Sequence, residues 1–234
     1  MAPVARELAS NRGVLEPLQT AASVTGQVEE LKTTLEEKGN LPIILIGYSW
    51  GAWLGYLVAA HHPSLVRKLV LIGSGPFEEK YVARFQETRL SRLSEDEKTE
   101  YRSILARLSD PRAEGQDASL ARLGELASKA DSYDPLPGEP EAIAFQAEIH
   151  QRVWQDAVEM RRSGRLLGLA KQVRCPVVAI HGDYDPHPAD GVQAPLSIAL
   201  KSFRFILLRN CGHTPWIEKQ AKEAFYHTLK GELR

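Results

Sequence analysis

The sequence has few cysteines, almost no net charge and no long apolar run. Its two cysteines, Cys175 and Cys211, are too few for a disulfide framework or a structural zinc site. The 29 Lys and Arg nearly balance the 30 Asp and Glu, which leaves no basic surplus for nucleic acid. The longest apolar stretch, residues 41–46, is far shorter than the roughly 20 residues that span a bilayer. The first residues also lack the apolar segment of a secretory signal. We therefore expect a cytoplasmic protein without nucleic-acid or membrane partners.

What the sequence does contain is a length and composition typical of a globular protein. Its 234 residues are 43% hydrophobic and 25% charged, enough for one large domain with a sizeable core. Residues 1–76 and 168–234 alternate between strand-like and helix-like patterns, whereas residues 77–167 are charged and rich in helix formers. Alternation of this kind predicts a mostly parallel sheet. We expect an α/β core formed by the first and third blocks, with the middle block inserted as a helical cap.

In the first block, two apolar runs of strand length, residues 42–46 and 68–72, flank an almost wholly apolar helix predicted over residues 52–61. A capped amphipathic helix precedes them, with its apolar positions at 28, 31 and 35. No convincing strand is predicted before residue 41. The third block predicts strands over residues 176–182 and 203–208, with a closing helix from about residue 218.

The middle block has the signals of several helices. A capping box opens one of them at Ser94, and three prolines within residues 134–140 require a loop. A long helix follows, whose apolar positions begin at Phe145. Its Trp154 and His150 are explained by ordinary packing and a solvated face. If the cap covers the carboxyl ends of the strands, Phe145 and Trp154 are the side chains expected to select the length of a substrate.

One serine lies on a predicted strand-to-helix turn, in the string Gly47-Tyr48-Ser49-Trp50-Gly51. A tight turn here would present the Ser49 hydroxyl at the carboxyl end of the sheet. We expect both glycines to be needed because side chains at their positions would collide. The buried strand before the turn and the buried helix after it favour a nucleophile over an idle serine in a glycine-rich turn.

A serine hydroxyl becomes an effective nucleophile when a base takes its proton and a carboxylate orients that base. In an open α/β sheet these groups come from loops at the carboxyl ends of strands. The loops after the predicted strands 176–182 and 203–208 supply the candidates Asp183, Asp185, His187 and His213. The order Ser49, Asp185, His213 along the chain is the one expected for this kind of sheet.

These motifs resemble those of the α/β-hydrolase superfamily, in the branch with a helical cap inserted between core strands. Residues 47–51 resemble its nucleophile elbow, residues 181–185 its acid loop and residues 211–213 its histidine loop. The resemblance implies that Ser49 is the nucleophile, His213 the base and Asp185 the carboxylate that holds His213. It also implies an oxyanion donor in the backbone N–H of Trp50, and no cofactor or metal.

The other candidate acid and histidines receive different roles. Asp183 is the first aspartate of the Gly-Asp-x-Asp string, and the resemblance implies that it orders the loop. We do not expect His181, which closes a strand, or His187, which stands between two prolines, to be the base. His61 and His62 lie at the far end of the helix after Ser49, where they are expected to be cap or surface residues.

Members of this superfamily carry further strands, and a second oxyanion donor, ahead of the position that residue 41 occupies here. We therefore expect an N-terminally shortened core of about four strands, in which residues 41–46 form an exposed hydrophobic edge. Slow catalysis and self-association through that edge are the expected consequences. An incomplete gene product would show the same features.

The resemblance implies a serine hydrolase that cleaves a small carboxylic ester or related acyl substrate through an acyl-enzyme intermediate. An iminopeptidase-like amide hydrolase or a carbon–carbon bond hydrolase would use the same three residues, and the sequence does not separate them. A non-catalytic protein that binds a small molecule in the same pocket is the alternative from another class.

Overall fold

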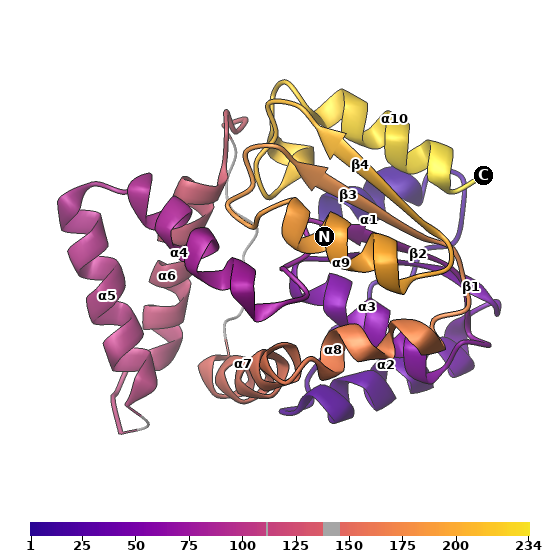
Figure 1. Cartoon of the computed structure of the whole chain (residues 1–234), viewed down its shortest axis with the longest axis horizontal. Coiled ribbons are helices and arrows are strands. Elements are labelled where there is room, and N and C mark those ends of the chain that lie inside the picture. The colour runs from indigo at the N-terminus through magenta and orange to yellow at the C-terminus, as the bar shows by residue number, and fades with distance from the viewer. Residues whose placement is uncertain (111, 138–145) are drawn as a thin grey trace.

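The computed structural model describes residues 1–110, 112–137 and 146–234. Within them, one sheet is formed by the strands β1 (Ile43–Tyr48), β2 (Val66–Ile72), β3 (Val177–Gly182) and β4 (Phe203–Leu208). They are hydrogen-bonded in the order β1-β2-β3-β4, and each neighbouring pair is parallel (Figure 1). The predicted parallel α/β sheet is confirmed. The carboxyl ends of all four strands therefore lie at the same end of the sheet.

Helices cover both faces of this sheet because successive side chains of a strand point to opposite sides. Leu69 and Leu71 of β2 pack in one apolar cluster, with α2 (Val24–Lys38), α3 (Trp50–His61), α8 (Arg165–Gly168) and α9 (Asp190–Ala199). Val70 and Ile72 pack in the other, with α1 (Ala2–Leu8) and α10 (Lys222–Glu232). Each β2 side chain named here is completely buried. The sequence analysis did not anticipate α1.

The segment between β2 and β3 is helical wherever it is described. It contains α4 (Val82–Ser91), α5 (Glu95–Ser109), α6 (Gln116–Asp131) and α7 (Ala147–Arg162), and a short 3₁₀ turn, η1 (Glu79–Tyr81), precedes them. The predicted capping box at Ser94 is present. Figure 1 shows α4, α5 and α6 beside the sheet, with α7 returning toward it. Phe145 lies outside the described residues.

Two further 3₁₀ turns, η2 (Leu169–Gln172) and η3 (Pro215–Ile217), complete the described secondary structure. Among the helices of the described ranges, none combines the length and the apolar character needed to cross a membrane.

The outer edge of β1 carries unpaired backbone groups. The N–H groups of Ile43 and Ser49 donate to the β2 side, to the carbonyls of Leu65 and Ile72. Alternate residues of a strand point their N–H groups the same way, so the N–H groups of Ile44 and Ile46 face outward. Within residues 1–110, 112–137 and 146–234, no other strand pairs with this edge. Such an edge is a template for association with another chain.

We expect this chain to self-associate through β1. Sedimentation velocity should show oligomers whose share grows with concentration. Ile44→Pro should shift the protein toward monomer with unchanged circular dichroism, because it removes an outward N–H from an edge strand. Leu45→Pro is the matched control and should unfold the sheet, since that N–H points toward β2. A wild-type chain that stays monomeric at every concentration would contradict the expectation.

Candidate active site

Ser49 lies in a strained turn between β1 and α3. Its backbone has φ 52° and ψ −119°, in the positive-φ region that side-chain-bearing residues rarely adopt. The turn is held on one side by the Ser49 N–H, which donates to the carbonyl of Ile72. The serine thus stands at the carboxyl end of β1, as predicted from the strand and helix that flank it. Because α3 begins at Trp50, the Trp50 N–H belongs to the first turn, where intrahelical acceptors are missing.

The two glycines around Ser49, Gly47 and Gly51, differ in how much space their surroundings leave for a side chain. A Cβ atom at Gly47 would lie 2.0 Å from the Gly51 carbonyl oxygen, so only glycine fits there. A Cβ atom at Gly51 would have no neighbour within 4 Å. The expectation that both positions exclude a side chain by collision is therefore wrong for Gly51. The backbone of α3 approaches β1 at Gly47, whereas Gly51 faces open space.

Asp185 and His213 meet at the carboxyl ends of β3 and β4. The His213 Nδ1 atom lies 2.7 Å from Asp185 Oδ2, and the Asp185 side chain is completely buried. The His213 ring also packs on the Tyr48 ring, with centroids 5.0 Å apart. Gly73, which follows β2, makes room for it, because a Cβ atom there would lie 3.1 Å from His213 Nδ1. Strands β1, β2, β3 and β4 thus all contribute to placing this histidine.

His187, set aside in the sequence analysis, binds the other oxygen of the same carboxylate. Asp185 Oδ1 accepts from the His187 backbone N–H at 2.9 Å and lies 2.8 Å from His187 Nδ1. The sequence signal for this contact was present, since His187 follows Asp185 by two residues in a loop at the carboxyl edge. His181 Nε2 lies 3.7 Å from Asp185 Oδ2 and bonds to the His187 carbonyl. Asp183 instead accepts from the Cys211 N–H and joins the two loops.

The pKa values of the three buried groups are shifted in different directions: those of Asp185 and His187 are lowered, and that of His213 is raised. Burial raises the pKa of Asp185, but attraction to His213, His187 and His181 and the hydrogen bond from His187 hold it well below its usual value. Burial lowers the pKa of His187 to about 4 despite the nearby carboxylate. Burial also lowers the pKa of His213, but the charge and hydrogen bond of Asp185 outweigh it and raise this pKa above 6.5. At neutral pH the site therefore holds a carboxylate, a neutral His187 and a more basic His213.

An ionised carboxylate can only accept, so Nδ1 of each ring donates to Asp185, and Nε2 becomes an acceptor whenever the ring is neutral. Within the described chain, no hydrogen bond joins Ser49 Oγ to either histidine. Asp185, His187 and His213 also lie close enough together to bind a metal ion. A metal would have to displace the Nδ1 protons that already bond to the carboxylate.

The loop carrying His213 is bound to the end of α6 by the carboxylate of Glu218 and the backbone carbonyl of Asp131, two residues that the sequence analysis did not single out. Glu218, completely buried, accepts the N–H groups of Gly212 at 3.0 Å and of Tyr133 and Asp134 at 2.8 Å. The backbone carbonyl of Asp131 accepts the His213 N–H at 2.8 Å. The Asp131 carboxylate binds Arg89 of α4 through two nitrogens. Neither acid carries a local signal of burial, because Glu218 stands where the closing helix is predicted to begin and Asp131 lies in a charged helical stretch.

A small cavity of about 40 Å³ lies between Ser49 and α7. Ser49, Trp53, Trp154 and His187 contribute to its walls. Trp154 is 41% exposed and stacks on Trp53, with ring centroids 6.2 Å apart, and Phe85 stacks on His187 at 4.2 Å. Trp154 therefore does more than pack on a solvated helix. The cavity has room for only a few water molecules.

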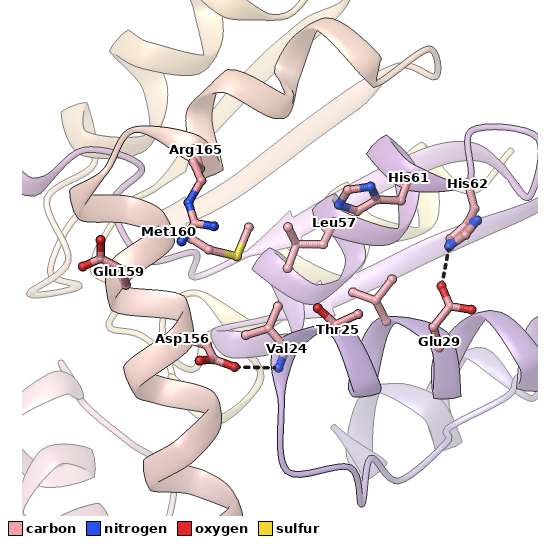
Figure 2. A pocket seen from close by; sticks show the side chains of 11 residues that line it. Val24, Thr25, Glu29, Leu57, His61, His62, Asp156, Glu159, Met160 and Arg165 are labelled. Carbon is pink, nitrogen blue, oxygen red and sulfur yellow. Dashed lines mark hydrogen bonds and ion pairs between the residues drawn. The ribbon is translucent and has the colours of Figure 1, made fainter.

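A larger cavity, about 490 Å³, lies elsewhere, between α2, α7 and the far end of α3 (Figure 2). His61 and His62 border it, and His62 Nε2 lies 3.4 Å from Glu29. The twelve residues of α3 separate these histidines from Ser49 by about 18 Å at 1.5 Å per residue. Neither histidine belongs to the candidate active site, in agreement with the expectation from their position.

Parallel strands with helices on both faces, and a serine, an acid and a histidine after their carboxyl ends, define the class of the α/β hydrolases. The sequence also matches the family model of the alpha/beta hydrolase fold over residues 20–220. The chain belongs to this family. A search of curated protein sequences finds no match.

Solved structures of the same fold include several hydrolases. VinJ is 19% identical, with a TM-score of 0.57 over 90% of this chain and 72% of that chain. A proline iminopeptidase from Mycobacterium smegmatis is 17% identical, with a TM-score of 0.57 over 92% and 73%. A monoacylglycerol lipase from Paleococcus ferrophilus is 16% identical, with a TM-score of 0.56 over 90% and 75%. At these identities the likeness shows the fold alone.

We expect NMR titration of the histidine rings to show His213 with a pKa above 6.5 and His187 with a pKa near 4. Asp185→Asn should lower the pKa of His213 below 6.5, because burial would then act without the neighbouring charge. Asp183→Asn is the control and should leave His213 unchanged. A larger effect of Asp183→Asn would show that Asp185 was wrongly chosen.

Proposed function

We propose that this protein is a serine hydrolase acting on small carboxylic esters or related acyl substrates. The observation that supports this most is the combination of Ser49 in a strained turn with a buried Asp185–His213 pair at the same sheet edge. Strain of this kind persists where the surrounding structure enforces it, and it is concentrated at functional sites. Membership of the α/β hydrolase family agrees with hydrolysis in general.

In the proposed reaction, Ser49 Oγ attacks the carbonyl carbon while His213 Nε2 takes the hydroxyl proton. His213 then gives that proton to the leaving alkoxide, and an acyl-enzyme remains. Water, activated by the same Nε2, hydrolyses the acyl-enzyme and restores Ser49. Asp185 stays ionised and stabilises the protonated His213, which agrees with the lowered pKa of this carboxyl group.

His213 suits the role of base better than His187 does. A base must hold the proton it accepts, and the pKa of His213 is raised whereas that of His187 is lowered to about 4. His187 would instead remain neutral and present Nε2 toward the cavity. The developing oxyanion would be bound by the Trp50 N–H. With that donor alone, the rate should fall about 10²- to 10³-fold below that of an enzyme with two donors.

Replacing Ser49 with Ala should lower ester hydrolysis by more than about 10³-fold, because the attacking atom is lost. Hydrolysis of a p-nitrophenyl ester measures the rate, and circular dichroism should be unchanged. Ser74→Ala is the control, since this buried hydroxyl bonds to the adjacent Gly75 carbonyl, and it should keep activity.

A fluorophosphonate probe separates catalysis from mere binding. The proposal expects one equivalent of probe on Ser49, confirmed by mass spectrometry of the labelled peptide. Ligand binding without any labelling would instead support a non-catalytic protein, and labelling of another serine would refute the assignment of the nucleophile.

A further inference from the structure

The cavity beside Ser49 contains a cation that the proposed chemistry does not use. Arg161, at the end of α7, contributes to its wall together with Ser49 and His187. The other described residues around the cavity are aromatic, glycine or proline, and none is an acid. A single ionised side chain in a mostly apolar pocket is the arrangement by which binding sites select one charged group.

Arg161 is buried, and its guanidinium is paired through one of its three nitrogen atoms. Its side chain is 7% exposed, and its Nε donates to Glu79 Oε2 at 2.8 Å. Glu79 is 46% exposed, so solvent weakens its hold on the guanidinium. Within the described residues, Nη1 and Nη2 of Arg161 have no hydrogen-bond acceptor. The guanidinium also lies 5.6 Å from the ring of Trp53, which helps to place it beside the cavity.

We infer that the substrate of this site carries a carboxylate, which binds the terminal nitrogens of Arg161 while its ester group lies at Ser49. This inference rests on the proposed function and names the substrate class: esters with a second, ionised acid group, such as half-esters of dicarboxylic acids. A guanidinium presents two parallel N–H donors to a carboxylate, and a buried cation gains most from such a partner. The aromatic walls formed by Trp53, Trp154 and Phe85 would pack on the hydrocarbon between the two groups.

A cavity of about 40 Å³ does not hold such a substrate, so a side chain must move on binding. Trp154 is the side chain best placed for this, because it is 41% exposed and is held in the cavity wall by stacking on Trp53 and His150. Its displacement would open the path from solvent to Arg161 without breaking a buried hydrogen bond.

The test compares monoethyl esters of dicarboxylic acids of four to eight carbons with ethyl esters of monocarboxylic acids of the same lengths. Released acid is followed by titration. At the best length, the wild type should show a kcat/KM for the half-ester about 10- to 100-fold above that for the neutral ester, the range expected for charge-assisted hydrogen bonds. Arg161→Gln should remove this preference, mainly by raising KM for the half-esters, so that their kcat/KM falls to that for neutral esters of the same length. Arg162→Gln, on the exposed side of α7, is the matched control.

Glu79→Gln separates substrate binding from a merely structural ion pair. If the Arg161–Glu79 pair only joins α7 to η1, Glu79→Gln and Arg161→Gln should lower stability and all activities alike. If Arg161 binds the substrate carboxylate, Glu79→Gln frees the guanidinium and should increase the preference for half-esters, opposite to Arg161→Gln. Equal effects of the two variants would overturn the inference.

Calorimetry with the Ser49→Ala variant separates failure of this inference from failure of the proposed function. Binding of monoethyl adipate that is lost on adding Arg161→Gln, with no hydrolysis by the wild type, would uphold the carboxylate site and refute the hydrolase. Hydrolysis of neutral esters at least as fast as half-esters would uphold the hydrolase and refute the carboxylate site.

Discussion

The candidate site depends on one buried charge, the carboxylate of Asp185. Burial alone would raise the pKa of this group, and it stays ionised because His213 and His187 both direct Nδ1 atoms at it. Its charge also affects the pKa values of the two histidines differently. Attraction to the carboxylate outweighs burial for His213, whose pKa is raised, but not for His187, whose pKa is lowered. Removing one partner of such a buried charge typically destabilises a protein by about 3–5 kcal/mol. The same interaction therefore serves stability and the proposed chemistry.

A second set of buried carboxylates connects this site to the helices outside the sheet. Glu218 accepts backbone N–H groups from both the histidine loop and the segment after α6, and Asp131 holds Arg89 while its carbonyl binds His213. The helical segment is thus joined to the core by these hydrogen bonds as well as by the chain at its two ends. The end of α6 is thus hydrogen-bonded to the loop that holds the candidate base, and α7 contributes Trp154 and Arg161 to the wall of the cavity.

Two cavities of the described structure differ in what surrounds them. The larger one has charged residues that already pair with neighbours, such as Glu29 with His62 and Glu159 with Arg162. The smaller one lies against the strained serine and contains a guanidinium with unused donors. The proposed function places the substrate in the smaller cavity, because binding sites are recognised by convergent polar groups as well as by volume.

The sequence by itself determined the parallel sheet, the helical segment between β2 and β3, and the loops carrying Ser49, Asp185 and His213. These features depend on local patterns: apolar runs of strand length, a capping box at Ser94, and polar residues directly after predicted strands. The strand over residues 203–208 was predicted to the residue because its apolar run is bounded by polar residues on both sides. Strain at Ser49 was equally readable, since the glycine two residues before it leaves room for the close turn.

Only the tertiary structure decided which groups share a partner. His213 follows Asp185 by 28 positions, and pairing of β3 with β4 brings it to the carboxylate that His187 contacts from within the same loop. Glu218, Arg89 and Arg161 carry no local signal, because a charged residue in an amphipathic helix or loop reads as solvent-exposed until packing buries it. The sequence pattern reports which face of an element is apolar. It does not report which charged side chains two packed elements enclose between them.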